Sequence, residues 1–134
     1  MTLVAGHHGG FKHLLLHRPL SSPGNLLRVD EAIADVEASR AAGILLDLRH
    51  LHPRPDTLDS FCMAKHLATT LLGPRLRVAL LVTAANFAEG RFIETVCVNR
   101  GGLVRVFRNT VAARAWLRAR LERATPPGLS AEAQ

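Results

Sequence analysis

The side chains with the greatest capacity for chemistry include seven histidines. The His7-His8 pair and the His50-x-His52 spacing could each give a zinc ion two nitrogen ligands. A zinc site needs three or four ligands from histidine, cysteine or carboxylate, and the sequence places no third ligand at a matching spacing. We therefore expect surface histidines, with no bound metal or other cofactor.

A thiol beside a base is the one arrangement that could support nucleophilic catalysis. Cys62 precedes His66 by four residues, which is one turn of a helix. Cys62 and Cys97 both fall in helical stretches rich in apolar residues, and neither has the C-x-x-C spacing of redox or metal-binding cysteines. We interpret both as reduced thiols in the core. Thiol chemistry at Cys62 and His66 is the minor alternative to a protein without catalytic activity.

Two hydroxyl side chains stand where a helix is expected to begin. Thr57 and Ser60 lie beside the carboxylates of Asp56 and Asp59. A phosphate on either hydroxyl would lie at a helix N-terminus, where free backbone N–H groups and the helix dipole stabilise negative charge. The alternative is that all four residues only cap the first helical turn.

Polar residues also follow two expected strands. Ligands of open α/β sheets gather outside the carboxyl ends of the strands. The candidate pocket residues at these ends are Asp47, Arg49, His50, Thr83 and Asn86. The alternative is that Asp47 and Thr83 only satisfy backbone groups there.

Positive charge is concentrated in the C-terminal half of the chain. The formal net charge is +6, yet residues 1–74 are neutral, and residues 75–123 hold ten arginines against three glutamates. The arginines of the last expected strand and helix form a candidate face for anionic partners: Arg105, Arg108, Arg114, Arg118 and Arg120. Phospholipids, phosphorylated proteins and nucleic acid carry the matching charge. Because the few aromatic residues fall mostly on stripes expected to be buried, base stacking and nucleic-acid binding are not expected.

The elements that must position these groups alternate short apolar runs with helix-period runs, which is typical of an α/β domain. Strands are expected at Thr2–Ala5 and Phe11–His17, forming a hairpin, and then at 44–48, 77–83 and 103–107. Helices are expected at about 22–43, 56–72, 86–100 and 109–121. The order is β-β-α-β-α-β-α-β-α in one domain over residues 1–123. Pro126-Pro127-Gly128 predicts a disordered tail at 124–134.

The position of one strand and the buried faces of three helices can be assigned from the sequence. The run at 77–83 is the most apolar and is expected near the centre of the sheet. One helix face is expected to bury Phe61, Ala64, Ala68 and Leu71, and another Phe92, Ile93, Val96 and Cys97. The last helix is expected to bury Ala113, Trp116, Leu117 and Leu121.

Several of these runs together resemble a known family. Ile44-Leu45-Leu46-Asp47-Leu48-Arg49, the strand at 78–82 and the stretch from Arg105-Val106-Phe107 to Trp116-Leu117 are similar to parts of bacterial STAS/SEC14-like domains, which include anti-sigma-factor antagonists. The resemblance covers about residues 26–121. It implies a mixed sheet of four or five strands flanked by four helices, and a binding or signalling protein rather than an enzyme.

In the phosphorylated antagonists of that family, an Asp-Ser pair begins the helix after a strand ending in Asp-Leu, and a partner kinase phosphorylates the serine. The resemblance therefore implies a phosphoacceptor at Ser60, with Thr57 nearby. The sequence departs from the pattern because the preceding loop is longer, and Phe61 and Cys62 replace the small residues that follow the family's serine.

The functional expectation is a non-catalytic STAS-like regulatory or protein-interaction module in bacterial signalling, with a protein partner or a second copy of itself. The alternative is a small-ligand or lipid-binding protein that uses the pocket at the carboxyl ends of the strands. The N-terminus lacks the basic start and long apolar core of a secretory signal, and the longest apolar run, Val78 to Val82, is too short to span a bilayer. We therefore expect a cytoplasmic protein.

Overall fold

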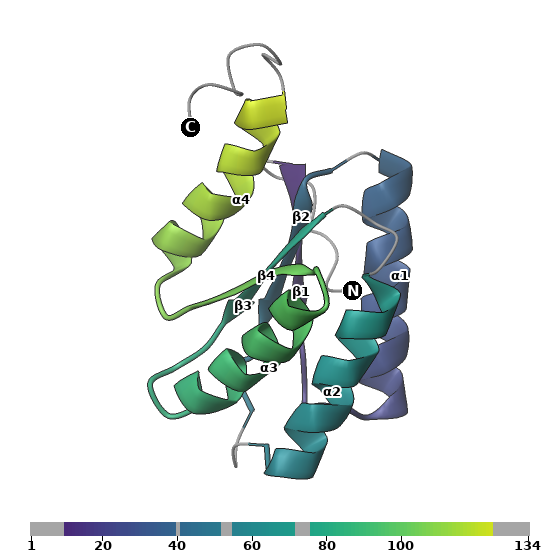
Figure 1. Cartoon of the computed structure of the whole chain (residues 1–134), viewed down its shortest axis with the longest axis vertical. Helices are drawn as coiled ribbons and strands as arrows, with labels where there is room; N and C mark the ends of the chain where they lie inside the picture. Colours follow the sequence, from purple (N-terminus) through teal and green to yellow (C-terminus); the bar gives the residue numbers. More distant parts are fainter. Residues whose placement is uncertain (1–9, 40, 52–54, 72–75, 125–134) are drawn as a thin grey trace.

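The computed structural model describes residues 10–39, 41–51, 55–71 and 76–124, with side chains as far as Ala119. Strands and helices alternate along the chain (Figure 1): β1 (Phe11–Leu15), α1 (Pro23–Ser39), β2 (Gly43–Asp47), α2 (Thr57–Thr70), β3 (Arg77–Leu81), α3 (Phe87–Asn99), β4 (Leu103–Phe107) and α4 (Thr110–Ala124). The four strands form one parallel sheet in the order β1-β2-β3-β4. The predicted single α/β domain is confirmed.

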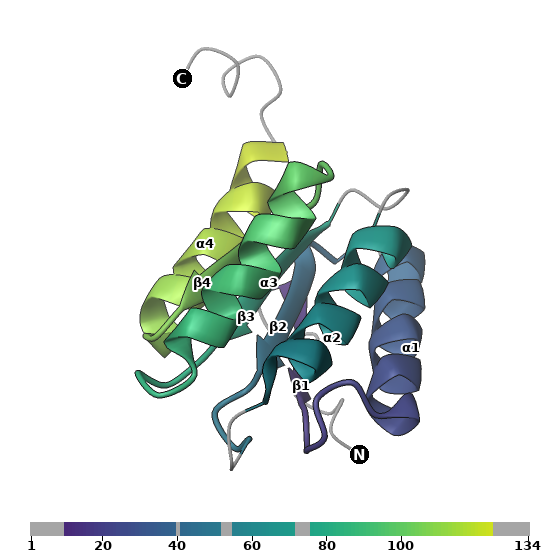
Figure 2. The ribbon, with the colours of Figure 1, turned by 60° about the horizontal axis from the view of Figure 1, so that its bottom comes forward.

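Three helices cover one face of this sheet, and α4 covers the other (Figure 2). Because the strand order runs in one direction, right-handed crossovers place α1, α2 and α3 on the same face. Even-numbered strand residues such as Leu46 and Leu80 pack under these three helices. Odd-numbered residues such as Leu45 pack under α4 with Leu117. The two faces of each strand therefore belong to two separate hydrophobic clusters.

Most of the predicted elements are confirmed. β2 and β3 are the two central strands, and all five residues of β2 are buried, as its unbroken apolar run predicts. The N-terminus of α4 is capped as expected, since the Asn109 side chain accepts a hydrogen bond from the Ala112 N–H at 3.0 Å. The described sheet is parallel throughout rather than mixed. The hairpin partner at Thr2–Ala5 and the tail at 125–134 lie outside the described residues.

Two helix faces differ from the prediction. Phe61 is 45% exposed and Phe92 is 37% exposed, although both were expected in the core. In α3 the close contact with the sheet is made by Gly90, where a Cβ atom would lie 2.7 Å from Cγ2 of Val106. Phe92 is two residues further, about 200° around the helix, so its ring turns away from the sheet. In α2 the buried line runs through Ser60 and Ala64, which turns Phe61 outward.

Candidate functional site

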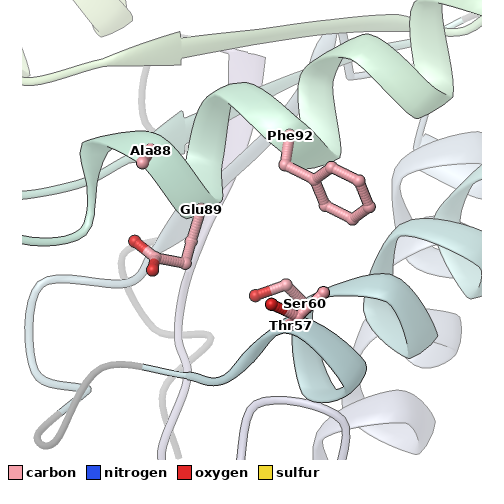
Figure 3. Close-up of a pocket in the computed structure, with 5 residues that line it drawn as sticks. All are labelled: Thr57, Ser60, Ala88, Glu89 and Phe92. Atoms are coloured by element: carbon pink, nitrogen blue, oxygen red, sulfur yellow. The ribbon is translucent and has the colours of Figure 1, made fainter.

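A pocket of about 220 Å³ opens between the first turns of α2 and α3 (Figure 3). The described residues that line it are Thr57, Ser60, Ala88, Glu89 and Phe92. It lies at the carboxyl end of the sheet, because α2 follows β2 and α3 follows β3. Its volume is below the several hundred Å³ of usual small-molecule sites, so it suits one side chain or a small ligand.

The most unusual group in this pocket is the hydroxyl of Ser60. Ser60 is 1% exposed, and its Oγ makes no hydrogen bond to any residue that the structure describes. Figure 3 shows this hydroxyl directed into the space between α2 and α3, with Phe92 on the α3 side of that space and the carboxylate of Glu89 turned away from Ser60. A buried hydroxyl without a partner is destabilising, and a bound group that exchanges a hydrogen bond with it would recover that loss.

The two carboxylates of the same helical turn have structural partners. Asp56 is the N-cap of α2, and its side chain accepts a hydrogen bond from the Asp59 N–H at 2.7 Å. The Asp59 carboxylate accepts bonds from the backbone N–H groups of Leu20 at 3.0 Å and Ser21 at 2.7 Å. Asp59 thus holds the β1–α1 loop against α2. The acids cap and brace the helix start, while the hydroxyls of Thr57 and Ser60 face the pocket.

The two candidate phosphoacceptors differ in burial, and this difference leads to a stability prediction. Ser60→Glu should lower the free energy of unfolding by about 2 kcal/mol or more, because a charge replaces a side chain that is 1% exposed. Thr57→Glu should change it by less than about 1 kcal/mol, because residue 57 is exposed in the first turn, where negative charge is favourable. Ser60→Ala should be neutral or stabilising by up to about 1 kcal/mol. Urea unfolding followed by circular dichroism measures all three, and equal losses in the two Glu variants would contradict the buried placement of Ser60.

The strand-end residues fall into two separate groups. In the first, Asp47 is 2% exposed, and its carboxylate accepts hydrogen bonds from Nε and Nη2 of Arg49, each at 2.9 Å. Nε2 of His13 lies 3.2 Å from the same carboxylate. Burial would raise the pKa of Asp47, but hydrogen bonds from His13 and Arg49 outweigh it and hold that pKa well below its usual range. Asp47 therefore stays charged and joins β1 to β2.

In the second group, Asn86 is 2% exposed, and its amide Nδ2 donates to the carbonyl of Leu48 at 3.1 Å. The Asn86 N–H donates to the carbonyl of Thr83 at 3.1 Å. These bonds tie the β3–α3 turn to the end of β2, while His50 is exposed. None of the five predicted pocket residues is among the described residues that line the pocket.

Nothing in the sequence pattern marked His13 as a partner of Asp47, or the three α3 residues Ala88, Glu89 and Phe92 as pocket residues. Because ligands of open α/β sheets gather outside the carboxyl ends of the strands, the first turn of α3, which follows β3 at that edge, could have been predicted as part of the site. No spacing indicated that Phe92 would be exposed.

The described geometry does not pair the thiol of Cys62 with His66. Nε2 of His66 lies 2.8 Å from the Asp30 carboxylate of α1, and no hydrogen bond joins it to Cys62. Cys62 is exposed, so its predicted core position is wrong; it lies on the outer side of α2, next to Phe61. Cys97 is buried as predicted, its Sγ lies 3.7 Å from the Ala64 carbonyl, and burial raises its pKa to about 11.

Thiol labelling should separate the two cysteines. At pH 8, Cys62 should react with a maleimide or a disulfide reagent at the rate of an exposed thiol. Cys97 should react at least a hundredfold more slowly, because it is buried and its pKa is raised, and should reach the same rate in denaturant. Mass spectrometry of the labelled peptides gives both rates. Fast labelling of Cys97 in the native protein would contradict its burial between α3 and α2.

The arginines of the anionic-partner face lie around α4. Arg105, Arg108 and Arg118 are exposed, Arg114 is half-buried, and Arg120 lies beyond the described side chains. Three guanidinium groups rest on aromatic rings: Arg105 on Phe107 at 5.6 Å, Arg108 on Phe87 at 5.1 Å and Arg114 on Phe11 at 5.9 Å. Among the described residues, no carboxylate lies within ion-pair distance of these four arginines. These arginines stay the predicted face for an anionic partner.

The predicted histidine pairs are only partly described, since His7, His8 and His52 lie outside the described residues. Within the described ranges, no three or more His, Cys, Asp or Glu side chains are placed to hold a metal ion. No helix in the described part of the chain combines the length and apolar character needed to cross a membrane.

Comparisons with known proteins leave the family open. No family model, curated protein or solved structure matches the chain. The geometry shows an α/β fold in which four parallel strands alternate with helices. The resemblance to STAS/SEC14-like domains is a prediction beyond that fold.

Proposed function

We propose that this chain is a non-catalytic, STAS-like regulatory or protein-interaction module, and that a partner protein docks over the first turns of α2 and α3. The observation that carries the proposal is the pocket between these helices together with the apolar side chains exposed around it. Phe92 lines the pocket and is 37% exposed, and Phe61 follows the pocket residue Ser60 and is 45% exposed. Leu58, beside Thr57, is 70% exposed.

The placement of these side chains supports a docking surface. Seven large apolar side chains are exposed in the described part of the chain; one of them, Phe92, lines this pocket, and another, Phe61, follows the lining residue Thr57 by one helical turn. Exposed aromatic residues beside a small cavity are typical of interfaces, where an anchoring side chain of one protein fills a cavity of the other. An isolated exposed leucine or valine needs no such explanation.

The resemblance to STAS/SEC14-like domains also supports a docking surface at the first turn of α2. In the antagonists it concerns, the regulatory serine stands at the start of the helix that corresponds to α2. In this chain the exposed hydroxyl of that turn is Thr57, and Ser60 is buried in the pocket wall. A phosphate on Thr57 would lie at the rim of the docking surface and would change its charge by about −2.

A photo-cross-linking amino acid tests the docking surface directly. It would be placed at Phe61 and, as a matched control, at Val111, which is 75% exposed on α4 over the opposite face of the sheet. In cells that make this protein, position 61 should give an adduct with one discrete protein, and Phe92→Asp should abolish it. Position 111 should not give that adduct. An adduct of equal yield at both positions, or none at 61, would refute the proposal.

A second candidate function, binding of a small ligand, is favoured by the Oγ of Ser60, which has no hydrogen-bond partner among the described residues and lines the open pocket of about 220 Å³. Native mass spectrometry of the freshly purified protein, compared with the denatured mass, distinguishes the two. Extra mass that is lost on denaturation would favour the ligand-binding function. A bare protein would favour the interaction module.

A further inference from the structure

The outer edge of β4 carries backbone groups that the sheet does not use. β4 is the last strand of the sheet and pairs only with β3 among the described strands. The Val82 N–H donates to the carbonyl of Phe107 at 2.9 Å, so Phe107 directs its backbone groups toward β3. Because this direction alternates along a parallel strand, Val104 and Val106 direct theirs outward. The edge could therefore pair with another strand.

One of these outward-facing backbone groups, the N–H of Val106, already has a carboxylate as its hydrogen-bond partner. The Val106 N–H donates to Oε1 of Glu94, which reaches across from α3, at 3.3 Å. The Glu94 carboxylate also lies 3.9 Å from Nε of Arg91. Glu94 thus covers part of the edge, as side chains often do on exposed strands. An incoming strand must displace it, so Glu94 competes with any ligand of this edge.

The side chains next to this edge are basic and apolar. Leu103, Arg105 and Phe107 lie on the α4 side of β4, where Leu103 is 38% exposed and Arg105 is exposed. Arg108 follows the strand and is also exposed. The rings beneath Arg105 and Arg108 hold their guanidinium groups in place, which lowers the entropy lost on binding a carboxylate.

We propose that an acidic peptide segment of a partner protein adds to β4 as a further parallel or antiparallel strand. Its backbone would bond to Val104 and Val106, and alternate carboxylates would lie on the α4 side of the sheet beside Arg105, while Arg108 adds positive charge beyond the end of the strand. The open backbone groups favour a peptide over nucleic acid or a lipid surface, because neither of these can continue a β-sheet. This surface lies on a different element from the docking surface at α2 and α3, so the two proposals stand or fall separately.

The test uses a labelled seven-residue peptide of alternating glutamate and threonine, with an alternating lysine and threonine peptide as its control. Fluorescence anisotropy with the full chain should show binding of the first peptide only. Arg105→Gln should weaken that binding at least fivefold. Arg100→Gln makes the same charge change at an exposed residue after α3 and should weaken it less than twofold. Glu94→Ala should strengthen it at least threefold, because it frees the Val106 N–H.

Hydrogen exchange separates strand addition from plain charge attraction. Bound glutamate peptide should slow exchange of the Val104 and Val106 amides, and should leave the amides of β1 unchanged. Binding without that protection, or equal weakening by Arg105→Gln and Arg100→Gln, would overturn the proposal. So would equal or tighter binding, with the same dependence on Arg105, of a short DNA duplex or of vesicles with 30% phosphatidylglycerol. Loss of the cross-link at Phe61 would leave this result unaffected.

Discussion

Gly43→Ala is expected to lower the free energy of unfolding by about 3 kcal/mol or more. A Cβ atom at residue 43 would lie 2.1 Å from the carbonyl oxygen of Arg77 and 2.9 Å from Cδ2 of Leu117. The Arg77 oxygen belongs to the backbone of β3, which is in register with Gly43 on β2. It cannot rotate away as a side chain could. Leu117, on α4, is completely buried, so it has no free space either.

Gly24→Ala is the matched control. Residue 24 lies in the first turn of α1, and an added Cβ would meet no heavy atom within 4 Å. That variant should be unchanged or more stable by up to about 1 kcal/mol, because alanine favours the helix and restricts the unfolded chain. Urea unfolding of both variants, followed by circular dichroism, gives the two free energies. A loss below 1 kcal/mol in Gly43→Ala would mean that α4 does not pack closely against β2.

These glycines show where local sequence patterns reach their limit. Spacing placed Gly43 only at the end of an expected helix and Gly90 only inside one. In the structure, both allow a close approach between elements that are distant in sequence. Gly43 lies against β3 and α4, and Gly90 lies against Val82 and Val106. Contacts of this kind depend on how separate elements pack against one another. The spacing of residues along a single element carries no information on that packing.

The parts of the fold that follow from local patterns were predicted well. An apolar run without alternation predicts a strand covered on both faces, and β2 is buried throughout. The stripe of α4 is confirmed at Ala113 and Leu117, which are fully buried, while Trp116 is only half-buried against the same cluster. In both cases burial within or against the sheet sets the pattern of apolar residues, so the periodicity of apolar residues along the element was enough to predict its buried residues.

The candidate site was harder to predict because it depends on two helices at once. The rule that ligands gather at carboxyl ends indicated the correct edge of the sheet. It did not distinguish the two faces of that edge, and Asp47 turned out to face the α4 side with His13, away from the pocket. Phe92 was expected in the core, since a ring at helical spacing is usually buried. Phe92 is exposed because Gly90 is the residue of α3 that packs closely against the sheet, and Phe92 lies on the opposite side of the helix.

Asp47→Ala is expected to lower the free energy of unfolding by about 3 kcal/mol at pH 7, because it leaves the guanidinium of Arg49 and the ring of His13 at the end of the sheet without their buried carboxylate. Arg49 and His13 both contact that carboxylate. Asp30→Ala is the control, since Asp30 pairs with His66 but its side chain is 46% exposed. The control should lose less than about 1 kcal/mol.

The pH dependence of Asp47→Ala follows from the direction of the pKa shift. Burial would raise the pKa of Asp47, but the hydrogen bonds from His13 and Arg49 lower it below its value in the unfolded chain, which is about 4. The carboxylate therefore stabilises the folded protein above pH 4, and this contribution is lost as the pH falls below that value. Urea unfolding at pH 7 and pH 3 should show the difference between wild type and Asp47→Ala shrinking by about 1 kcal/mol. A constant difference would mean that Asp47 acts through packing alone, and equal losses in the two variants would contradict its role as the buried charge that joins β1 to β2.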